Sequence, residues 1–211
     1  LSKYRKINSI GQGGFGKVFK IEEKETGEIY AEKISNFLFN IDSKDEILNL
    51  AREVNLNAGM NHPAVLKFIG YTKIDINDQQ YPVIITEYAK NGSLAKLLTE
   101  ERRGLVTKYW TDTKKLINIY GIASGMKYLH SNNILHRDLK PGNILLDAML
   151  LPKIGDFGLS KQTHSNQYSR TFQSENIIKG TQYYIAPEVY KEKVFTKAND
   201  VYAFGLIVYE I

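Results

Sequence analysis

The sequence predicts an α+β fold in which a strand-rich part is followed by a mainly helical part. Up to about residue 88, most apolar residues fall in short β-favouring runs separated by turn residues, and a single run has helical spacing. Beyond the turn-forming segment 89–92, the long apolar runs have helical spacing. We therefore expect two lobes: residues 1–88, an antiparallel sheet with one main helix, and residues 89–211, which are mainly helical.

Each element of the first part has a local signal. Residues 17–21 and 29–34 are β-favouring, and the turn-rich segment 25–28 joins them as a hairpin. Two further strands are predicted at 65–71 and 81–88. A helix that ends near Gly59 is indicated by apolar residues at spacings of 0, 3, 4, 7 and 11, namely Ile47, Leu50, Ala51, Val54 and Ala58.

The second part is predicted to contain three helices. Ser93 is a good N-cap for a helix that starts at Leu94. An apolar helix begins near Asp200. Between them, a long helix that ends near His130 is marked by Leu116, Ile119, Tyr120, Ala123 and Met126.

The segment between the long helix that ends near His130 and the helix that begins near Asp200 is predicted to be irregular, with two short strands at 144–146 and 152–154. The polar stretch 161–180 exceeds the usual length of a loop, so we expect it to be functional or mobile.

Composition agrees with a folded domain and excludes several classes of protein. The 211 residues are 43% hydrophobic and 24% charged, which argues against disordered, collagen-like and coiled-coil chains. The net charge of +5 is compatible with nucleic acid, a membrane surface or a phosphate ligand and does not choose among them. The lack of cysteine excludes thiolate zinc sites and thiol catalysis, and no apolar run reaches the roughly 18 residues needed to cross a bilayer.

A glycine-rich segment, residues 10–18, contains the pattern G-x-G-x-x-G. Glycines let a backbone approach phosphates closely and donate N–H groups without a Cβ clash. A dinucleotide site requires a helix directly after the last glycine, whereas here a strand follows and turns back through Gly27. The loop is therefore expected to cap a hairpin, which suits a flap over a nucleotide.

The next strand carries a small residue and a lysine on one face. With a side-chain period of two, Ala31 and Lys33 point to one face and Glu32 to the other. Ala31 can pack against a flat base while Lys33 reaches phosphate oxygens, although a lone lysine is more often a surface residue. Glu53, on the predicted helix, is either the partner of Lys33 or an exposed carboxylate.

The strongest chemical signal follows the long helix. The string His136-Arg-Asp-Leu-Lys-Pro-Gly-Asn143 precedes a predicted strand, and Asp156-Phe-Gly158 begins eighteen residues after Asp138. Two carboxylates, an amide and a lysine in adjacent loops suit phosphoryl transfer. One carboxylate accepts the hydroxyl proton, while the other and the amide hold Mg²⁺.

In this order, these motifs resemble the eukaryotic-type protein kinase family. The resemblance runs from the glycine loop to the last residue and includes Ala31-x-Lys33, Glu53 and Ala186-Pro-Glu188. It implies the bilobal kinase fold, with ATP and Mg²⁺ as cofactors and a protein substrate as phosphoryl acceptor.

The resemblance also implies roles in the helical lobe. Asp138 would be the catalytic base, and Lys140 would steady the γ-phosphate. Asn143 and Asp156 would hold Mg²⁺, and Asp200 would brace the catalytic loop.

Other roles are implied for the nucleotide site. Lys33 would bind the α- and β-phosphates and pair with Glu53. The segment 87–89 would be the hinge that hydrogen-bonds adenine, with Thr86 as the gatekeeper behind it. The residues implied to bind the nucleotide are Ile10, Gly11, Gln12, Gly13, Gly14, Phe15, Gly16, Lys17, Val18, Ala31, Lys33, Glu53, Thr86, Glu87, Ala89 and Leu145.

Lys140 and Thr181 together resemble the serine/threonine type, because tyrosine kinases usually have Ala or Arg in place of this lysine. The hinge segment 86–94 resembles the tyrosine-kinase-like group of serine/threonine kinases.

Two positions depart from the family pattern. Glu32 stands where an apolar residue is usual, and it should be tolerated because it faces away from the nucleotide. Asn57 replaces an apolar residue in the stack that links the lobes. A buried amide must find partners or cost about 1–3 kcal/mol, which would make the active arrangement less favoured.

Arg137 suggests control by phosphorylation, since its guanidinium suits a phosphate on the polar stretch. The candidate sites are Thr171 and Ser174, then Ser169 and Tyr168. The histidines outside the motif lack metal-ligand companions and are expected to be caps or surface groups, namely His62, His130 and His164.

Two functions stay open at this point: a serine/threonine kinase, and a pseudokinase or nucleotide-binding scaffold. The complete set of motif residues favours the first, and Asn57 favours the second. Expected partners are ATP, a protein substrate and regulatory proteins, without nucleic acid or a membrane segment. The expected location is the cytoplasm, or the cytosolic part of a larger protein. Set against the family, the helical lobe is expected to be incomplete, poorly stable, inactive alone and exposed over an apolar patch.

Overall fold

The computed structural model describes residues 1–13, 16–35, 54–73, 81–105, 108–157, 160–162 and 180–211. The chain forms two compact units, Leu1–Asn61 with Leu66–Ala89, and His62–Val65 with Lys90–Ile211. The second unit therefore takes four residues, 62–65, from within the segment that the sequence assigned to the first lobe.

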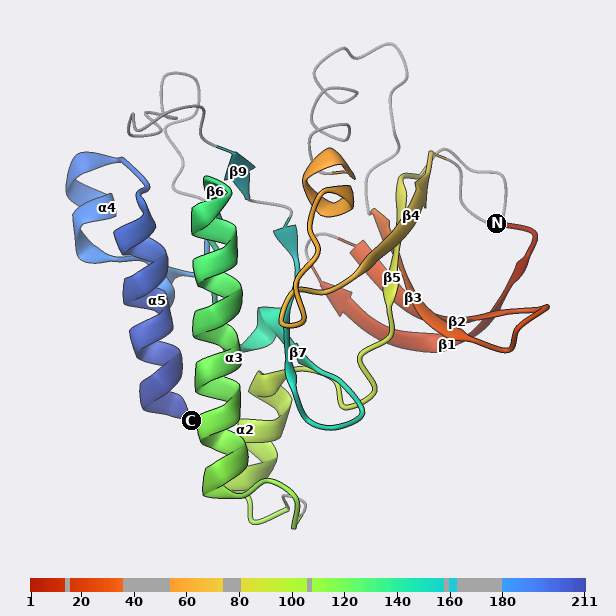
Figure 1. Cartoon of the computed structure of the whole chain (residues 1–211), viewed down its shortest axis with the longest axis horizontal. Coiled ribbons are helices and arrows are strands. Elements are labelled where there is room, and N and C mark those ends of the chain that lie inside the picture. Colours follow the sequence, from red (N-terminus) through yellow and green to blue (C-terminus); the bar gives the residue numbers. More distant parts are fainter. Residues whose placement is uncertain (14–15, 36–53, 74–80, 106–107, 158–159, 163–179) are drawn as a thin grey trace. The chain divides into compact units, whose positions relative to one another are not determined.

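The first unit contains an antiparallel sheet, as predicted, and its five strands lie in the order β1-β2-β3-β5-β4 (Figure 1). Its strands are β1 (Tyr4–Gly13), β2 (Gly16–Glu23), β3 (Ile29–Ser35), β4 (Phe68–Thr72) and β5 (Val83–Glu87). Strand β1 was not predicted, because most of its residues are polar or glycine and form no β-favouring run. It pairs with β2 through the register Gly13↔Gly16, so the glycine-rich segment does lie on a hairpin.

One face of this sheet is buried against an apolar cluster built on Tyr4, Ile21, Val83 and Ile85. Glu32 lies on the same face, since it is opposite Ile85 in the β3–β5 register. Its side chain is 1% exposed, and Lys6 Nζ lies 3.2 Å from its Oε2. Glu32 thus points away from Ala31 and Lys33, as expected, but it is a buried and ion-paired carboxylate.

Residues 54–58 are helical and form the described part of the predicted first helix. Asn57, on this segment, is 7% exposed, and the residue makes at least one further interaction.

The second unit is mainly helical, with α2 (Leu94–Arg102), α3 (Asp112–Ser131), α4 (Pro187–Glu192) and α5 (Lys197–Glu210). Ser93 caps α2 as predicted, its side chain accepting from Lys96 N. Helix α5 begins three residues before Asp200, because Thr196 and Asn199 form a reciprocal capping box at its start.

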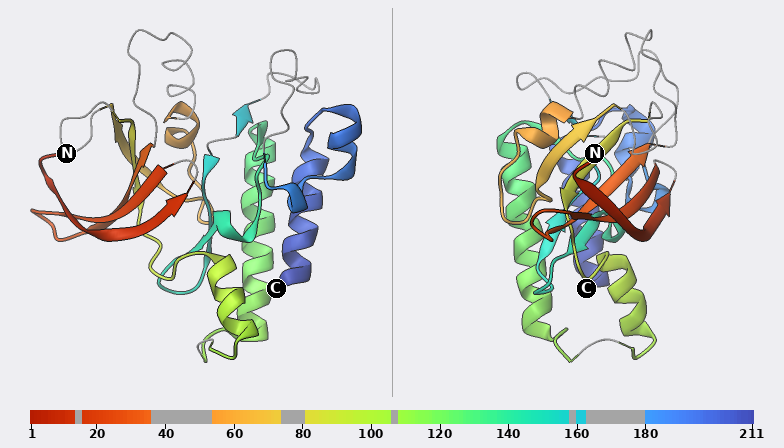
Figure 2. Two further views of the ribbon diagram at one scale, coloured as in Figure 1. Left: turned by 180° about the vertical axis from the view of Figure 1, so that it is seen from behind. Right: turned by 90° about the vertical axis from the view of Figure 1, so that its right-hand side faces the viewer.

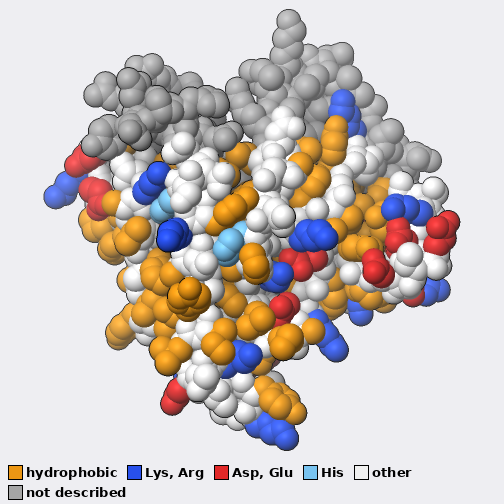
Figure 3. Space-filling view, in the orientation of Figure 1, with side chains coloured by type: hydrophobic (Ala, Val, Ile, Leu, Met, Phe, Trp, Pro, Cys, Tyr) orange, Lys and Arg blue, Asp and Glu red, His pale blue; other side chains and the backbone are white. Residues whose placement is uncertain are grey.

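Helices α3 and α5 lie side by side (Figures 1 and 2), and α3 also packs on strand β8 (Pro152–Ile154). The buried residues of α3 are Asn118, Ile122, Gly125, Met126 and Leu129. Two of the residues that marked this helix in the sequence, Leu116 and Tyr120, are 66% and 77% exposed. Hydrophobic side chains gather on the surface over α3 and α5 (Figure 3). Tyr209, on α5, is 90% exposed.

Short strands complete the second unit. The predicted strands are confirmed as β7 (Ile144–Leu146) and β8, which form an antiparallel pair. The pair β6 (Ile134–Leu135) and β9 (Lys161–Gln162) was not predicted. Two one-turn 3-10 helices, η1 (Pro141–Asn143) and η3 (Gln182–Tyr184), lie in the same unit. Among the described helices, none is both long and apolar enough to cross a membrane.

Candidate active site

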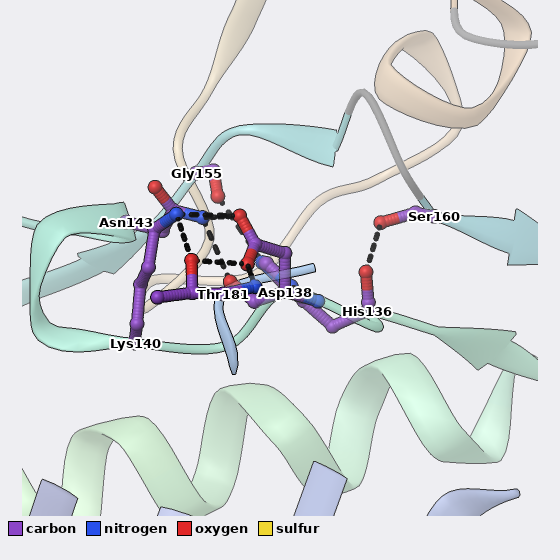
Figure 4. Close-up of polar contacts among 7 residues, drawn as sticks. All are labelled: His136, Asp138, Lys140, Asn143, Gly155, Ser160 and Thr181. Carbon is purple, nitrogen blue, oxygen red and sulfur yellow. Dashed lines mark hydrogen bonds and ion pairs between the residues drawn. The ribbon is translucent and has the colours of Figure 1, made fainter. Parts of the chain in front are cut away.

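The segment from β6 to β7 forms a tight loop whose side chains converge on Asp138 (Figure 4). Arg137 has a φ of 69°, a left-handed conformation that non-glycine residues rarely adopt. The 3-10 turn η1 follows, with Pro141 at its start and Asn143 N donating to Lys140 O at 2.9 Å. This backbone hydrogen bond closes the turn between Lys140 and Asn143.

The carboxylate of Asp138 is 5% exposed and is bound on both oxygens. Lys140 Nζ and Asn143 Nδ2 donate to its Oδ2 at 2.7 and 3.0 Å. Thr181 donates to its Oδ1 through both its backbone N–H and its hydroxyl, each at 2.9 Å. Lys140, Asn143 and Thr181, to which the family resemblance gave roles at the phosphate, the metal and the substrate, therefore meet at one carboxylate.

These donors determine the protonation of Asp138. Burial by itself raises the pKa of the carboxyl, but the hydrogen bonds from Lys140 and Thr181 and the charge of Lys140 outweigh it. The net pKa of Asp138 lies below its ordinary value. The carboxylate is therefore ionised at neutral pH and faces an ammonium group.

His136 connects this loop to the strand that precedes Asp156. The imidazole is fully buried, its Nδ1 accepts from Asp138 N at 3.3 Å, and its Nε2 lies 3.1 Å from Gly155 O. Since a carbonyl accepts, the proton is assigned to Nε2. With both nitrogens engaged and its ring 5.4 Å from that of Phe157, His136 acts as a packing and orienting residue.

Asp200 braces the loop from α5. Its Oδ1 accepts from Arg137 N and its Oδ2 from His136 N, both at 2.9 Å. His130 Nε2 lies 2.9 Å from the same Oδ2. The expectation that His130 is a cap or surface group is thus wrong: its side chain is 15% exposed and belongs to this network. No sequence signal names a partner 70 residues away.

Asn143 and Asp156 present the oxygen donors that a hard cation prefers. The side chain of Asn143 donates through Nδ2 to Asp138 O at 2.7 Å and to Asp138 Oδ2 at 3.0 Å. Within the described part of the chain, the amide Oδ1 is therefore available as a ligand. Gly155 N donates to Asn143 O at 2.9 Å, which holds the residue before Asp156 close to Asn143. Asp156 itself has a left-handed φ of 61°.

Arg137 is partly buried, and its guanidinium lies 5.4 Å from the centroid of the Phe195 ring. Burial lowers the pKa of Arg137 to about 10, against the opposing effect of Asp200, so the group stays charged at neutral pH. The candidate phosphorylation sites on the polar stretch 163–179 lie outside the described residues.

In the first unit, the predicted nucleotide residues share one face of the sheet. Val18 is opposite Lys33 in the β2–β3 register, and Ala31 is opposite Thr86 in the β3–β5 register. Directly opposite residues on neighbouring strands point to the same face, and this face is the reverse of the one that buries Glu32. Gly16 is required here, because its φ is +152° and a Cβ would lie 2.1 Å from Ile34 O.

The other predicted nucleotide residues are more scattered. Ile10, Gly11, Gln12 and Lys17 are exposed on the β1–β2 hairpin, with Gly13 at its end. Glu87 Oε1 accepts from Lys67 N at 2.8 Å, and Ala89 is 9% exposed. Leu145 lies in the second unit, bridged to Ser93. Gly14, Phe15 and Glu53 fall outside the described residues, and with them the Lys33–Glu53 pair.

The amino-acid sequence matches a known protein family and several known proteins. The family model described as protein kinase domain matches residues 4–211. Serine/threonine-protein kinase polo of Drosophila melanogaster is 33% identical over 210 residues, which cover 99% of this chain and 33% of that protein. Aurora kinase of Yarrowia lipolytica is 33% identical over 202 residues, covering 96% and 50%. Cysteine-rich receptor-like protein kinase 7 of Arabidopsis thaliana is 34% identical over 208 residues, covering 97% and 29%. The chain thus spans half or less of the length of these relatives.

Proposed function

The chain belongs to the protein kinase family, and on this premise we propose that it transfers the γ-phosphoryl group of ATP to serine and threonine hydroxyls of proteins. The carboxylate of Asp138 carries the proposal. It is ionised, as a general base for a hydroxyl group must be, and Lys140 and Thr181 hold it in one orientation.

In the proposed reaction, the substrate hydroxyl oxygen attacks the γ-phosphorus while the bond to the ADP oxygen breaks. Asp138 accepts the hydroxyl proton. Lys140, 2.7 Å from Asp138, brings a positive charge to the position where phosphate charge develops. Asn143 and Thr181 keep the carboxylate from rotating, since each donates to one of its oxygens.

Protein kinases generally use ATP with Mg²⁺. We assign Mg²⁺ binding to Asn143 Oδ1 and the Asp156 carboxylate, because both are hard oxygen donors and, among the described residues, the amide of Asn143 makes its hydrogen bonds through Nδ2. Bound there, Mg²⁺ would neutralise charge on the phosphates. On the sheet of the first unit, Ala31, Val18 and Thr86 would pack on the base and Lys33 would bind the phosphates, supported by their common face.

Serine/threonine specificity is supported by the contact between Lys140 and Thr181. Lys140 Nζ donates to Thr181 Oγ1 at 2.6 Å, so the lysine and the threonine are parts of one hydrogen-bonded unit around the base. Two of the relatives above are named serine/threonine or Aurora kinases. We place the reaction in the cytosol, where ATP is abundant, in agreement with a chain that has no cysteine.

The test is transfer of labelled phosphate from Mg-ATP to a generic protein, followed by phosphoamino-acid analysis of the product. We expect phosphoserine and phosphothreonine, and a rate that falls by about 10²–10⁴ in Asp138→Asn. Asp112→Asn, at an exposed aspartate in the first turn of α3, is the matched control. Equal transfer by wild type and Asp138→Asn would refute the base. Nucleotide binding without transfer would support a scaffold.

A further inference from the structure

Strand β1 carries the first half of the glycine-rich segment, yet its side chains give it few anchors. Tyr4, at its start, is buried in the apolar cluster of the first unit. Of residues 5–12, all of which the structure describes, Lys6 is the only one that is not exposed. Even Ile7 and Ile10, the apolar residues of this stretch, are 45% and 42% exposed. Burial of apolar side chains therefore does not hold this part of β1 in place.

The backbone pairing of β1 with β2 is irregular in the same stretch. The register shifts between Lys6 and Asn8 and again between Ser9 and Gly11. Each shift leaves one extra residue on β1 without a partner and bends the strand. A strand that is polar or rich in glycine has a weakly specified register, and a slip by one residue turns every side chain to the opposite face. Neither the apolar side chains nor the backbone ladder therefore specifies the register of β1 by itself.

The side chain of Lys6 crosses β2 and reaches β3. Its Nζ lies 4.4 Å from the centroid of the Phe19 ring on β2 and 3.2 Å from Glu32 Oε2 on β3. Glu32 is 1% exposed, and the residues opposite it are apolar, Phe19 on β2 and Ile85 on β5. In a register slipped by one residue, Lys6 would point to the other face and leave Glu32 buried without this ammonium. Stranding a buried carboxylate is strongly unfavourable, so the pair disfavours the slipped register.

We propose that Lys6 and Glu32 are positioning residues for the nucleotide, because their ion pair selects the register of β1. Glu32 directly precedes Lys33 on β3, and the glycine-rich segment continues β1 beyond Lys6. The pair thereby fixes the glycine-rich segment relative to the lysine that would bind the phosphates. Neither Lys6 nor Glu32 touches the nucleotide. The effect on ATP binding rests on the proposed function, whereas the register of β1 does not depend on it.

The two charges should matter for the register more than for stability. Replacing a buried ion pair by apolar residues of similar volume is often neutral for stability. With Lys6→Met and Glu32→Leu together, a slipped β1 exposes one apolar side chain instead of stranding a charge, so the slipped register becomes accessible. We therefore expect this double variant to fold and to populate more than one register of β1.

Nuclear magnetic resonance of the glycine amides tests the register without any need for activity. With isotopically labelled glycine, Gly11 and Gly16 should each give one amide signal in wild type, and several signals or a broadened one in the double variant. The matched control is Arg5→Met with Glu22→Leu. It removes an ion pair between the same two strands, β1 and β2, whose arginine is 68% exposed. This control should keep one signal for each glycine.

The affinity for Mg-ATP, measured by isothermal titration calorimetry, reports the consequence for the nucleotide. The apparent Kd scales inversely with the fraction of molecules in the competent register. A competent fraction of about a tenth to a third raises the Kd about 3- to 10-fold, and we expect this rise in the double variant at a Tm close to that of wild type. Lys6→Arg keeps the positive charge and should bind Mg-ATP like wild type.

Failure of the inference can be told from failure of the proposed function. One sharp signal for each glycine in the double variant overturns the inference, and so does an unchanged Kd when the wild type binds Mg-ATP. Multiple signals in the control as well would overturn the specific role of this pair. A wild type that binds no Mg-ATP refutes the proposed function, and the glycine signals still decide the register. Should the double variant not fold, Lys6→Met with Glu32→Gln replaces it, since it removes both charges and keeps the shapes.

Discussion

Thr181 donates to Asp138 twice, although the two residues are 43 positions apart. Its backbone N–H and its hydroxyl both bind Asp138 Oδ1 at 2.9 Å. Lys140 Nζ, a pure donor, binds Thr181 Oγ1 at 2.6 Å and Asp138 Oδ2 at 2.7 Å. The threonine hydroxyl therefore accepts from the lysine and donates to the base, which joins the segment before η3 to the catalytic loop.

The hydroxyl of Thr181 should matter more than its methyl group. Thr181→Val removes one hydrogen bond to a charged carboxylate, an interaction of about 1.5–3 kcal/mol, and we expect kcat to fall about 10- to 100-fold. Thr181→Ser keeps the hydroxyl and should stay within a few-fold of wild type. Steady-state kinetics at saturating Mg-ATP measures this. A valine variant as active as the serine variant would contradict the role of the hydroxyl.

The protonation of Asp138 should depend on Lys140. In the folded chain the pKa of Asp138 is below its ordinary value. The ionised carboxylate therefore stabilises the fold above the ordinary pKa, and this contribution is lost as the pH falls through the lowered pKa. In Lys140→Met, burial still raises the pKa of Asp138, but the main hydrogen-bond donor that lowers this pKa is gone. The pKa of Asp138 should therefore rise, and the stability that the ionised carboxylate contributes should begin to fall at a higher pH.

Titration of the Asp138 carboxyl carbon by NMR measures this shift. Lys114→Met is the control, since Lys114 Nζ binds Met149 O and lies outside the catalytic loop. An identical Asp138 titration in wild type and Lys140→Met would show that the ammonium does not set the pKa.

Two glycines of α3 should be required by packing. A Cβ at Gly121 would lie 2.6 Å from Cγ of the rigid Pro152 ring, and one at Gly125 would lie 3.2 Å from Ala64 O and 2.7 Å from Ile154 Cδ1. At Gly205 of α5, a Cβ would meet no atom within 4 Å apart from its chain neighbours and the backbone of its own helix. We expect Gly121→Ala to destabilise the unit by about 1–2 kcal/mol, and Gly205→Ala to stabilise it by up to about 1 kcal/mol.

Urea unfolding followed by fluorescence of the single tryptophan, Trp110, reports on this unit, because the indole is 5% exposed there. A Gly121→Ala variant as stable as Gly205→Ala would contradict close packing of α3 on β8.

Removing Lys6 from the Lys6–Glu32 pair should destabilise the fold, whereas replacing both residues by apolar ones should have a much smaller effect on stability. Lys6→Met leaves the carboxylate of Glu32, 1% exposed, without its ammonium at 3.2 Å. Loss of one partner of a buried ion pair typically destabilises a protein by about 3–5 kcal/mol. The effect should be smaller here, because Lys6 is 25% exposed and Glu32 has a further interaction. We therefore expect the free energy of unfolding to fall by about 1–3 kcal/mol.

The double variant Lys6→Met with Glu32→Leu should recover most of this stability, because apolar residues suit the surrounding cluster. Thermal unfolding of the single and double variants measures the recovery. A double variant as unstable as Lys6→Met would show that the cost does not come from the stranded carboxylate.

Much of the candidate site was predictable because its residues are close in sequence. Asp138, Lys140 and Asn143 lie within six positions, and their loop is shaped by its own turn and by the neighbouring strands β7 and β8. The N-cap at Ser93 is equally local. Short-range geometry of this kind follows from residue types and spacing, which is why the motif, both strands and the cap were all predicted.

Features that depend on distant partners were missed. Strands β6 and β9 have two residues each and exist only because they pair with each other. The polar strand β1 forms because β2 offers it a partner and a buried face. The inward side of α3 is decided by where β8 and α5 pack, which left Leu116 and Tyr120 outside.

By itself, the sequence determined the family, the two-part α+β organisation and the identity of the candidate base, because these depend on short motifs and local periodicity. Only the tertiary structure decided that His130 contacts Asp200, that Thr181 donates twice to one oxygen of Asp138, and that Glu32 is buried. The physical reason is common to all of these. Hydrogen bonds and burial between residues 26 to 70 positions apart depend on how helices and strands pack, and no local pattern encodes that.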